Sequence, residues 1–305
     1  MDIWQPEPGE TLLARVPVTF ASGAAMRVRG MRWFRDTERN DIQSELRNWP
    51  EGPLYTARSG GDALARNAAK GGILALGGII MAALSSAGGN LSGGSGSDSG
   101  SDTPHDPADE VADFPVMWAA SGTIARSLPW QLDPGRSDTK RYQTHAILTD
   151  RRLVIVGLPF YKKDLEIIED EVLWQIPRSA ISGIEPRDFK DGDDFKVTFT
   201  DGSWCRLSSF RRQRILRFMA PSVELTPLES LTSAQQSTVE AFVASKVQAP
   251  DAASPSVTRR PSGHFRVEIL LPSRFSSFFG APDVSMVMDS DGRQLEITEY
   301  HSEDF

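Results

Sequence analysis

The chain has 305 residues, with 33 Lys and Arg against 41 Asp and Glu, which gives a formal net charge of -8. Its pI is near 5.2, its hydrophobic content is 39% and its mean hydropathy is -0.31. These values allow one large domain or two ordinary ones with a real core, and they exclude a polytopic membrane protein. They provide no domain-wide basic field, so nucleic acid is not an expected partner.

The first ten residues, MDIWQPEPGE, have neither the basic n-region nor the apolar h-region of a secretory signal, which predicts a cytoplasmic protein. Cys205 is the only cysteine, so an internal disulfide and a thiolate metal cluster are excluded. Because it lies in the alternating stretch DGSWCRL, we interpret it as a packed core thiol and not as a nucleophile.

Residues 1–57 predict strands followed by a surface helix. The near-alternating apolar pattern of residues 10–34 predicts two strands and a turn. Residues 35–49 predict a helix that ends before Pro50. Its apolar face is formed by Ile42, Leu46 and Trp49. An echo between GETLLARVPVTF and SGTIARSLPWQL indicates either a second degenerate copy of the later β-region or, as we favour, an N-terminal piece of the same barrel separated by an insertion.

Residues 58–88 predict an apolar helix rich in Gly and Ala. Over residues 71–87 it would be about 25 Å long, just under the roughly 30 Å of a bilayer core. Its small residues recur at every fourth position, a spacing that lets helices approach closely, and they are Gly78, Ala82 and Ser86. Three alternatives stay open: burial or disorder in a soluble protein, association with a membrane or another copy of the chain, and a single membrane span.

Residues 89–113 are rich in Gly and Ser and then acidic, with six carboxylates and no Lys or Arg. This composition predicts a disordered tether.

Residues 114–248 contain short β-branched and aromatic runs separated by turn residues, which predicts a β-meander. The stretches LTDRRL and FTDGSW each predict a hairpin, and Asp201-Gly202 suits a type I′ turn. Four tryptophans in such runs are expected as core anchors: Trp118, Trp130, Trp174 and Trp204.

A capping helix is expected from RRQRILRFM or from TSAQQSTVEAFVASK. The apolar face of the second candidate is formed by Val239, Phe242, Val243 and Val247. Residues 249–262 predict a linker, and residues 263–305 predict a β-hairpin tail with SDGR as its turn.

The run THAILTDRRLVIVGLP, followed by VLWQIPRSAISGIE and FKVTFTDGSWCRL, resembles bacterial, actinobacterial-type proteins with a PH-like (pleckstrin-homology or GRAM-like) domain. The shared rhythm falls on 148–153, 176–184 and 195–207 and covers about a third of the chain. The resemblance implies an α+β, mainly-β fold: a bent antiparallel barrel or meander closed by a helix. Such domains dock peptides, proteins or lipid headgroups and do no chemistry, although fold alone does not decide which ligand is bound.

No HExxH, GxSxG, Walker A or GxGxxG motif occurs, and no His/Cys/Asp spacing fits a metal site, so we expect no catalytic residue, cofactor or metal. His145 is the one histidine in a predicted strand, where we interpret it as half-buried. The acidic groups at 169–171 and 191–194 are interpreted as solvated turns. An enzyme with a site assembled from unrelated loops is the competing hypothesis.

Basic pairs within the PH-like region are the candidate ligand-binding or headgroup-binding residues, since Lys and Arg bind phosphates and anionic lipids. They are Lys140, Arg141, Arg151, Arg152, Lys162 and Lys163. The structural alternative is ordinary charged surface.

The sequence therefore predicts a non-enzymatic binding or adaptor protein that docks a protein partner or an anionic headgroup. Attachment to the inner face of the cell membrane, peripheral or by a single span, would use residues 71–87. Homo-oligomers would form through the same helix. The alternative function is a membrane-active effector or stress-response protein whose Gly-rich helix inserts or oligomerises.

Overall fold

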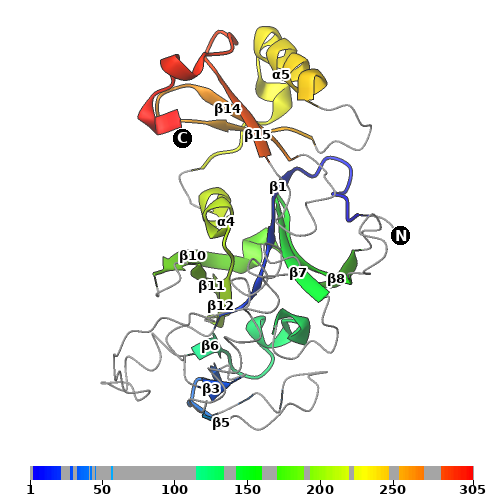
Figure 1. Ribbon diagram of the computed structural model, residues 1–305, viewed down its shortest axis with the longest axis vertical. Coiled ribbons are helices and arrows are strands. Elements are labelled where there is room, and N and C mark those ends of the chain that lie inside the picture. The colour runs from blue at the N-terminus through cyan, green and yellow to red at the C-terminus, as the bar shows by residue number, and fades with distance from the viewer. Residues whose placement is uncertain are drawn as a thin grey trace, which may run out of the picture. The chain divides into compact units, whose positions relative to one another are not determined.

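The computed structural model describes residues 3–21, 28–29, 33–40, 42, 45, 56–57, 115–133, 142–159, 170–188, 193–219, 223–246, 254–270 and 283–304. They form mainly strands with two α-helices, so the expected α+β, mainly-β class is confirmed (Figure 1). The chain divides into two compact units, one of residues 1–16, 145–178 and 213–305 and the other of residues 17–144 and 179–212. The predicted apolar helix and acidic tether lie outside the described residues.

A four-stranded sheet has the order β1-β7-β8-β9. Its strands are β1 (Leu12–Pro17), β7 (Tyr142–Thr149), β8 (Arg152–Pro159) and β9 (Glu171–Pro177). Because β1 lies beside β7, the N-terminal strand belongs to the sheet of the LTDRRL hairpin, as the insertion interpretation of the sequence echo predicts.

A second sheet has the order β10-β11-β12-β6-β4, with β2 also paired to β12. Its strands are β10 (Ile181–Arg187), β11 (Asp194–Phe199), β12 (Trp204–Ser208), β6 (Pro115–Trp118), β4 (Trp33–Arg35) and β2 (Thr19–Phe20). The two short strands β3 (Val28–Arg29) and β5 (Thr56–Ala57) pair with each other. Short 3-10 helices follow several strands: η2 (Ala125–Ser127), η3 (Trp130–Leu132) and η4 (Arg178–Ala180).

Aromatic side chains pack on the second sheet. Of the four tryptophans predicted as core anchors, Trp204 is buried, whereas Trp118, Trp130 and Trp174 are half-buried. Trp118 and Trp204 stand opposite each other on β6 and β12, and their rings stack at 6.5 Å with an interplanar angle of 8°. Phe20 and Phe34 meet edge to face at 5.5 Å. Cys205 is fully buried beside them on β12, and burial raises the pKa of its thiol, which suits the predicted core thiol.

The FTDGSW stretch forms a hairpin, but its turn differs from the predicted type I′. Gly202 donates to the carbonyl of Phe199 at 3.0 Å, and Phe199 donates to the carbonyl of Ser203 at 2.8 Å. A type I′ turn needs positive φ at both central residues. Among the described residues Arg39 is the only non-glycine with positive φ, so only Gly202, at 82°, is left-handed here. The connection is a type I turn followed by a left-handed glycine bulge.

The same pair of backbone hydrogen bonds recurs in three other turns, at 36–40, 260–264 and 289–293. The left-handed position, fourth in each, holds Gly263 (φ 86°) and Gly292 (φ 87°) in two of them and Arg39 (φ 69°) in the third. The helix predicted for 35–49 therefore does not begin there, because residues 36–40 close a turn. Ile42 is buried, and the other two residues of the predicted apolar face lie outside the described part of the chain.

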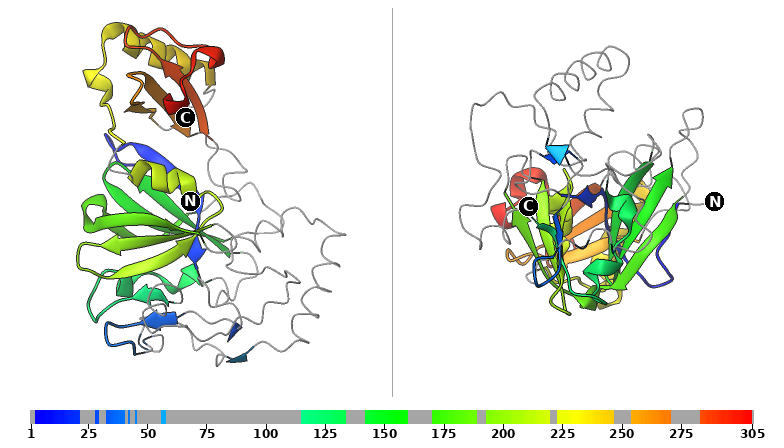
Figure 2. Two further views of the ribbon diagram at one scale, coloured as in Figure 1. Left: turned by 90° about the vertical axis from the view of Figure 1, so that its left-hand side faces the viewer. Right: turned by 90° about the horizontal axis from the view of Figure 1, so that it is seen from below.

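Both candidate capping helices form, as α4 (Arg212–Met219) and α5 (Ser233–Lys246). The longer helix α5 packs on a three-stranded sheet of β13 (Ser256–Arg259), β14 (Phe265–Leu270) and β15 (Asp283–Met288). Figures 1 and 2 both show the yellow helix alongside the orange strands. The predicted linker 249–262 thus contains a strand, and the predicted hairpin tail is part of a sheet with its own core.

That C-terminal core combines α5 with alternate residues of the strands. It consists of Leu231, Val239, Phe242, Val257, Val267, Ile269, Met286 and Met288, with Val243 packed against it. The predicted apolar face of α5 is therefore confirmed at its described positions, while Val247 lies outside them. Three further 3-10 helices are η5 (Leu228–Ser230), η6 (Ile297–Glu299) and η7 (Ser302–Asp304).

Candidate functional site

Two of the six predicted ligand-binding residues lie in described parts of the chain. Arg151 is in the turn between β7 and β8, and Arg152 is the first residue of β8. The other four, Lys140, Arg141, Lys162 and Lys163, lie outside the described residues, as do Gly78, Ala82 and Ser86 of the apolar stretch.

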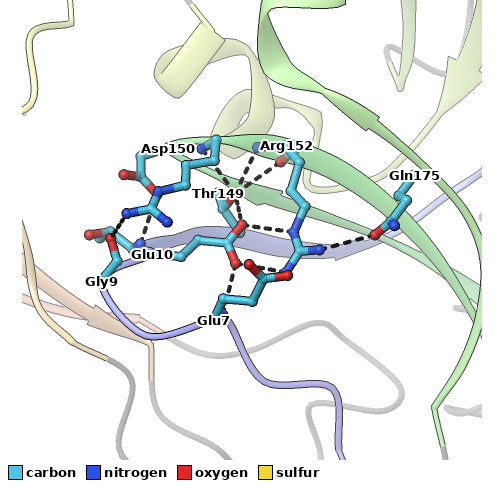
Figure 3. Close-up of polar contacts among 9 residues, drawn as sticks. Glu7, Gly9, Glu10, Thr149, Asp150, Arg152 and Gln175 are labelled. Atoms are coloured by element: carbon cyan, nitrogen blue, oxygen red, sulfur yellow. Dashed lines mark hydrogen bonds and ion pairs between the residues drawn. The ribbon is translucent and has the colours of Figure 1, made fainter.

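The Arg152 guanidinium is the centre of a polar cluster at this turn (Figure 3). Its Nε donates to Glu10 Oε1 at 2.9 Å and its Nη2 donates to Glu10 Oε2 at 2.8 Å, a bidentate pair. The hydroxyl of Thr149 donates to the same Oε1 at 2.6 Å. The Glu10 side chain is only 1% exposed. Its carboxylate is therefore a buried acceptor whose two oxygens accept hydrogen bonds from Arg152 and Thr149.

The remaining donors and the flat face of Arg152 contact three other side chains. Nη2 lies 3.0 Å from Glu7 Oε1, whose side chain is 65% exposed. Nη1 donates to Gln175 Oε1 on β9 at 3.1 Å. The guanidinium carbon lies 5.3 Å from the ring centre of Trp4, within the range of a cation–π contact.

Residues 3–10, here called the strap, bring Trp4, Glu7 and Glu10 to the sheet. A tight turn shapes the end of the strap: Glu10 N–H donates to Glu7 O at 2.9 Å, and Gly9 has φ 74°. Glu7 N–H in turn donates to Glu10 Oε2 at 2.8 Å. Arg151 Nη2 donates to Gly9 O at 2.6 Å, so both arginines of LTDRRL hold the strap.

The ion pair changes the pKa values of both Glu10 and Arg152. Burial raises the pKa of the Glu10 carboxyl, but the hydrogen bonds from Arg152 and Thr149 outweigh it and lower the pKa overall. The hydrogen bond to Glu10 likewise raises the pKa of Arg152 against the effect of burial. The pair is therefore ionised at neutral pH.

An apolar patch lies under the strap. Trp4 packs, with Leu12, against buried side chains of β7 and β8, which are Ile147, Val154, Val156 and Leu158. Trp4 is half-buried, so its ring covers this patch while one part of it faces solvent. The strap thus contributes an aromatic group to the sheet as well as two carboxylates.

A second buried ionic group anchors the strap backbone. Trp4 N–H donates to Asp170 Oδ2 at 2.7 Å. The same carboxylate accepts from Arg15 Nη1 at 2.6 Å and from Arg15 Nη2 at 2.7 Å. Arg15 Nε donates to His145 Nδ1 at 3.2 Å. Since arginine can only donate, this bond requires the acceptor form of Nδ1. His145 is fully buried, deeper than the half-buried position predicted for it.

Sequence reasoning missed the strap side of the site. It singled out Arg151 and Arg152, but it treated residues 3–9 only as evidence against a secretory signal and Glu10 only as the start of a predicted strand. The available signal was the spacing of Trp4, Glu7 and Glu10, one aromatic and two acidic residues at intervals of three. Its charge complements the two arginines of LTDRRL.

Within the described ranges, no group of three or more His, Cys, Asp or Glu side chains is placed to hold a metal ion. In that same part of the chain, no helix is both long and apolar enough to cross a bilayer. The predicted helix over 71–87 falls outside it.

Comparisons with models of protein families, with curated proteins and with solved structures found no match to this chain. The class of the protein therefore comes from its own structure, an α+β, mainly-β protein with an arginine-centred site at the turn between β7 and β8.

Proposed function

We propose that the protein is a non-enzymatic docking module, an adaptor, whose sheet β1-β7-β8-β9 binds an extended protein segment carrying aromatic and acidic side chains. The observation that carries this proposal is the strap itself. It lies on the sheet and is held at three points. Asp170, directly before β9, accepts a backbone N–H of the strap. On the sheet itself, Arg152 binds the strap carboxylates and the apolar patch contacts the indole. Those three contacts are the elements of peptide recognition.

The order of elements supports a PH-like architecture as part of this proposal. Along the chain, β7 to β9 extend the first sheet, β10 to β12 are successive neighbours in the second, and α4 follows directly. Strand β1 completes a set of seven strands and a helix, with residues 18–141 inserted after it. The resemblance stated above implies an antiparallel barrel or meander closed by a helix, a fold used for docking.

A peptide ligand is favoured over a lipid headgroup at this site. Arg151 is bound to a carbonyl and Arg152 to two carboxylates, so a phosphate would have to displace Glu7 and would still meet the buried charge of Glu10. A peptide carboxylate replacing Glu7 leaves the charge balance unchanged. The predicted membrane roles of residues 71–87 stay predictions.

The test uses the full-length chain with residues 3–8 replaced by GSGSGS, which removes Trp4 and Glu7 and keeps Glu10. A labelled peptide with the sequence of residues 3–9, IWQPEPG, is titrated and its fluorescence anisotropy is measured. We expect saturable binding that is lost when the peptide Trp becomes Ala and weakened by at most about fivefold when its Glu becomes Gln, because the lost ion pair is an exposed one. Absence of saturable binding to a folded replaced chain, checked by circular dichroism, would overturn the proposal.

The protein side of the contact is probed with Arg152→Gln in the replaced chain. It should weaken binding of the IWQPEPG peptide more than binding of the Glu-to-Gln peptide, because only the first peptide has the carboxylate contact to lose, while the contact of Arg152 with the peptide Trp is lost for both. If Arg152→Gln does not fold, the peptide substitutions on the otherwise unchanged surface provide the same test from the ligand side.

A further inference from the structure

We propose that the strap is a built-in competitor, a Gly9-hinged segment that closes the docking surface until a partner segment of similar chemistry displaces residues 3–8. This inference rests on the proposed docking function and adds its regulation. The strap is the model for the partner: an extended segment with an aromatic residue and a carboxylate three residues after it.

The strap has a fixed end and a displaceable end. Glu10 is 1% exposed, bonded to Thr149 and Arg152, and continues directly into β1 through Thr11, whose N–H donates to Asp150 Oδ1 at 2.8 Å. Residues 5, 7, 8 and 9 are exposed by contrast. Contacts of an exposed carboxylate such as Glu7 contribute little free energy, so the outer part of the strap can open while Glu10 stays in place.

Gly9 is placed to be the hinge. Its φ of 74° is in the left-handed region, where glycine is favoured. A Cβ at this position would lie 3.3 Å from Arg151 Nη2, the group that holds the Gly9 carbonyl. The closed strap therefore depends on the left-handed conformation of Gly9 and on the hydrogen bond from Arg151 to its carbonyl. Gly9 directly precedes the buried Glu10 and is itself exposed.

Opening would remove contacts that an incoming segment could replace. Asp170 would lose the Trp4 N–H, Arg152 would lose Glu7 and the ring of Trp4, and the patch of Ile147, Val154, Val156 and Leu158 would lose its cover. An incoming segment must supply an aromatic side chain with a free backbone N–H, and a carboxylate three residues later. A tethered strap competes at a high effective concentration, so the intact chain should bind such a segment weakly.

The experiment compares four full-length chains with the same IWQPEPG peptide: wild type, Arg151→Gln, Gly9→Ala and the GSGSGS replacement. Arg151→Gln removes the hydrogen bond to Gly9 O, and Gly9→Ala strains the closed turn, while neither touches Trp4, Asp170 or Arg152. We expect wild type to bind weakest, the two single variants about tenfold tighter, and the replaced chain tightest. Arg293→Gln, an exposed arginine of the C-terminal sheet region, is the charge-matched control and should bind as wild type does.

The outcomes separate the two proposals. Equal affinity of wild type, the single variants and the replaced chain would overturn the built-in competitor and leave the docking function standing. No binding to the replaced chain would overturn the docking function itself. Tighter binding by Arg293→Gln as well would show a nonspecific charge effect and would also overturn the competitor.

Discussion

Glu10 and Arg152 lie 142 residues apart in the sequence and form a bidentate ion pair in which the Glu10 side chain is buried and the Arg152 side chain is 19% exposed. The pair joins a residue two positions before β1 to the first residue of β8. It stabilises the first sheet and also forms part of the proposed docking site.

Removing the buried half of this pair should destabilise the protein much more than removing the exposed carboxylate beside it. Glu10→Gln leaves Arg152 without its main counter-ion, and we expect a loss of about 2–4 kcal/mol in the free energy of unfolding. Glu7→Gln, the matched control, should cost about 0–1 kcal/mol because its side chain is 65% exposed. Urea denaturation of both variants measures the difference, and equal losses would contradict the burial argument.

Acidification should weaken the first sheet through Glu10. Burial raises its pKa, but the hydrogen bonds from Arg152 and Thr149 lower it below the ordinary value of 4.5. A lowered pKa in the folded state stabilises the fold at pH values above 4.5, and that contribution is lost as the pH falls from 4.5 through the folded pKa. Urea midpoints measured from pH 6 to pH 3 should therefore fall less steeply for Glu10→Gln than for wild type. Parallel pH profiles would refute the role of Glu10.

Arg39 occupies a backbone conformation that glycine occupies in the three sister turns. With φ at 69°, its Cβ carries the left-handed penalty. Arg39→Gly should be more stable than Arg39→Ala by about 1 kcal/mol, because both lose the same side-chain contacts and only the Cβ distinguishes them. Thermal and urea unfolding of the pair provides the measurement, and a more stable alanine variant would disprove the strain.

Gly263 and Gly292 have the same φ to within a degree but different surroundings. A Cβ on Gly263 meets nothing within 4 Å, whereas on Gly292 it would lie 2.7 Å from the backbone nitrogen of Gln235 in α5. Gly263→Ala should cost about 1 kcal/mol from the backbone alone. Gly292→Ala should cost at least about 1 kcal/mol more, because α5 must move away from the turn. Similar unfolding free energies for the two variants would contradict this contact.

Asp304 fastens η7 to the turn between β13 and β14. Its buried carboxylate accepts from Ser262 Oγ at 2.5 Å and from the N–H of His301 at 2.7 Å, and it lies 3.0 Å from His264 Nδ1. Asp304→Ala should cost about 2–3 kcal/mol, since three polar partners lose their acceptor. Glu303→Gln, at an exposed neighbouring position, should change the unfolding free energy by less than about 0.5 kcal/mol. Comparable losses would exclude the buried carboxylate as the fastening group.

Local chemistry was readable from sequence wherever the interacting residues lie within a few positions of each other. The LTDRRL and FTDGSW hairpins and the SDGR turn depend on polar and glycine residues inside the turn itself, and α5 depends on the spacing of its own apolar residues. Even there the type I′ prediction failed at Asp201, because a type I turn with a glycine bulge uses the same two residues in different positions.

The sequence by itself determined the mainly-β class, the hairpins and the apolar face of α5, because alternation, turn residues and helical periodicity act through neighbouring residues. Only the tertiary structure decided that Arg152 pairs with Glu10, that Asp170 and Arg15 meet under Trp4, and that α5 belongs with β13 to β15. An arginine surrounded by many carboxylates along the chain has no local preference among them. Its partner is decided by the chain path, which places β1 beside β7 and so brings Glu10 close to Arg152. Glu10 is also buried, and a buried carboxylate without a partner would destabilise the fold.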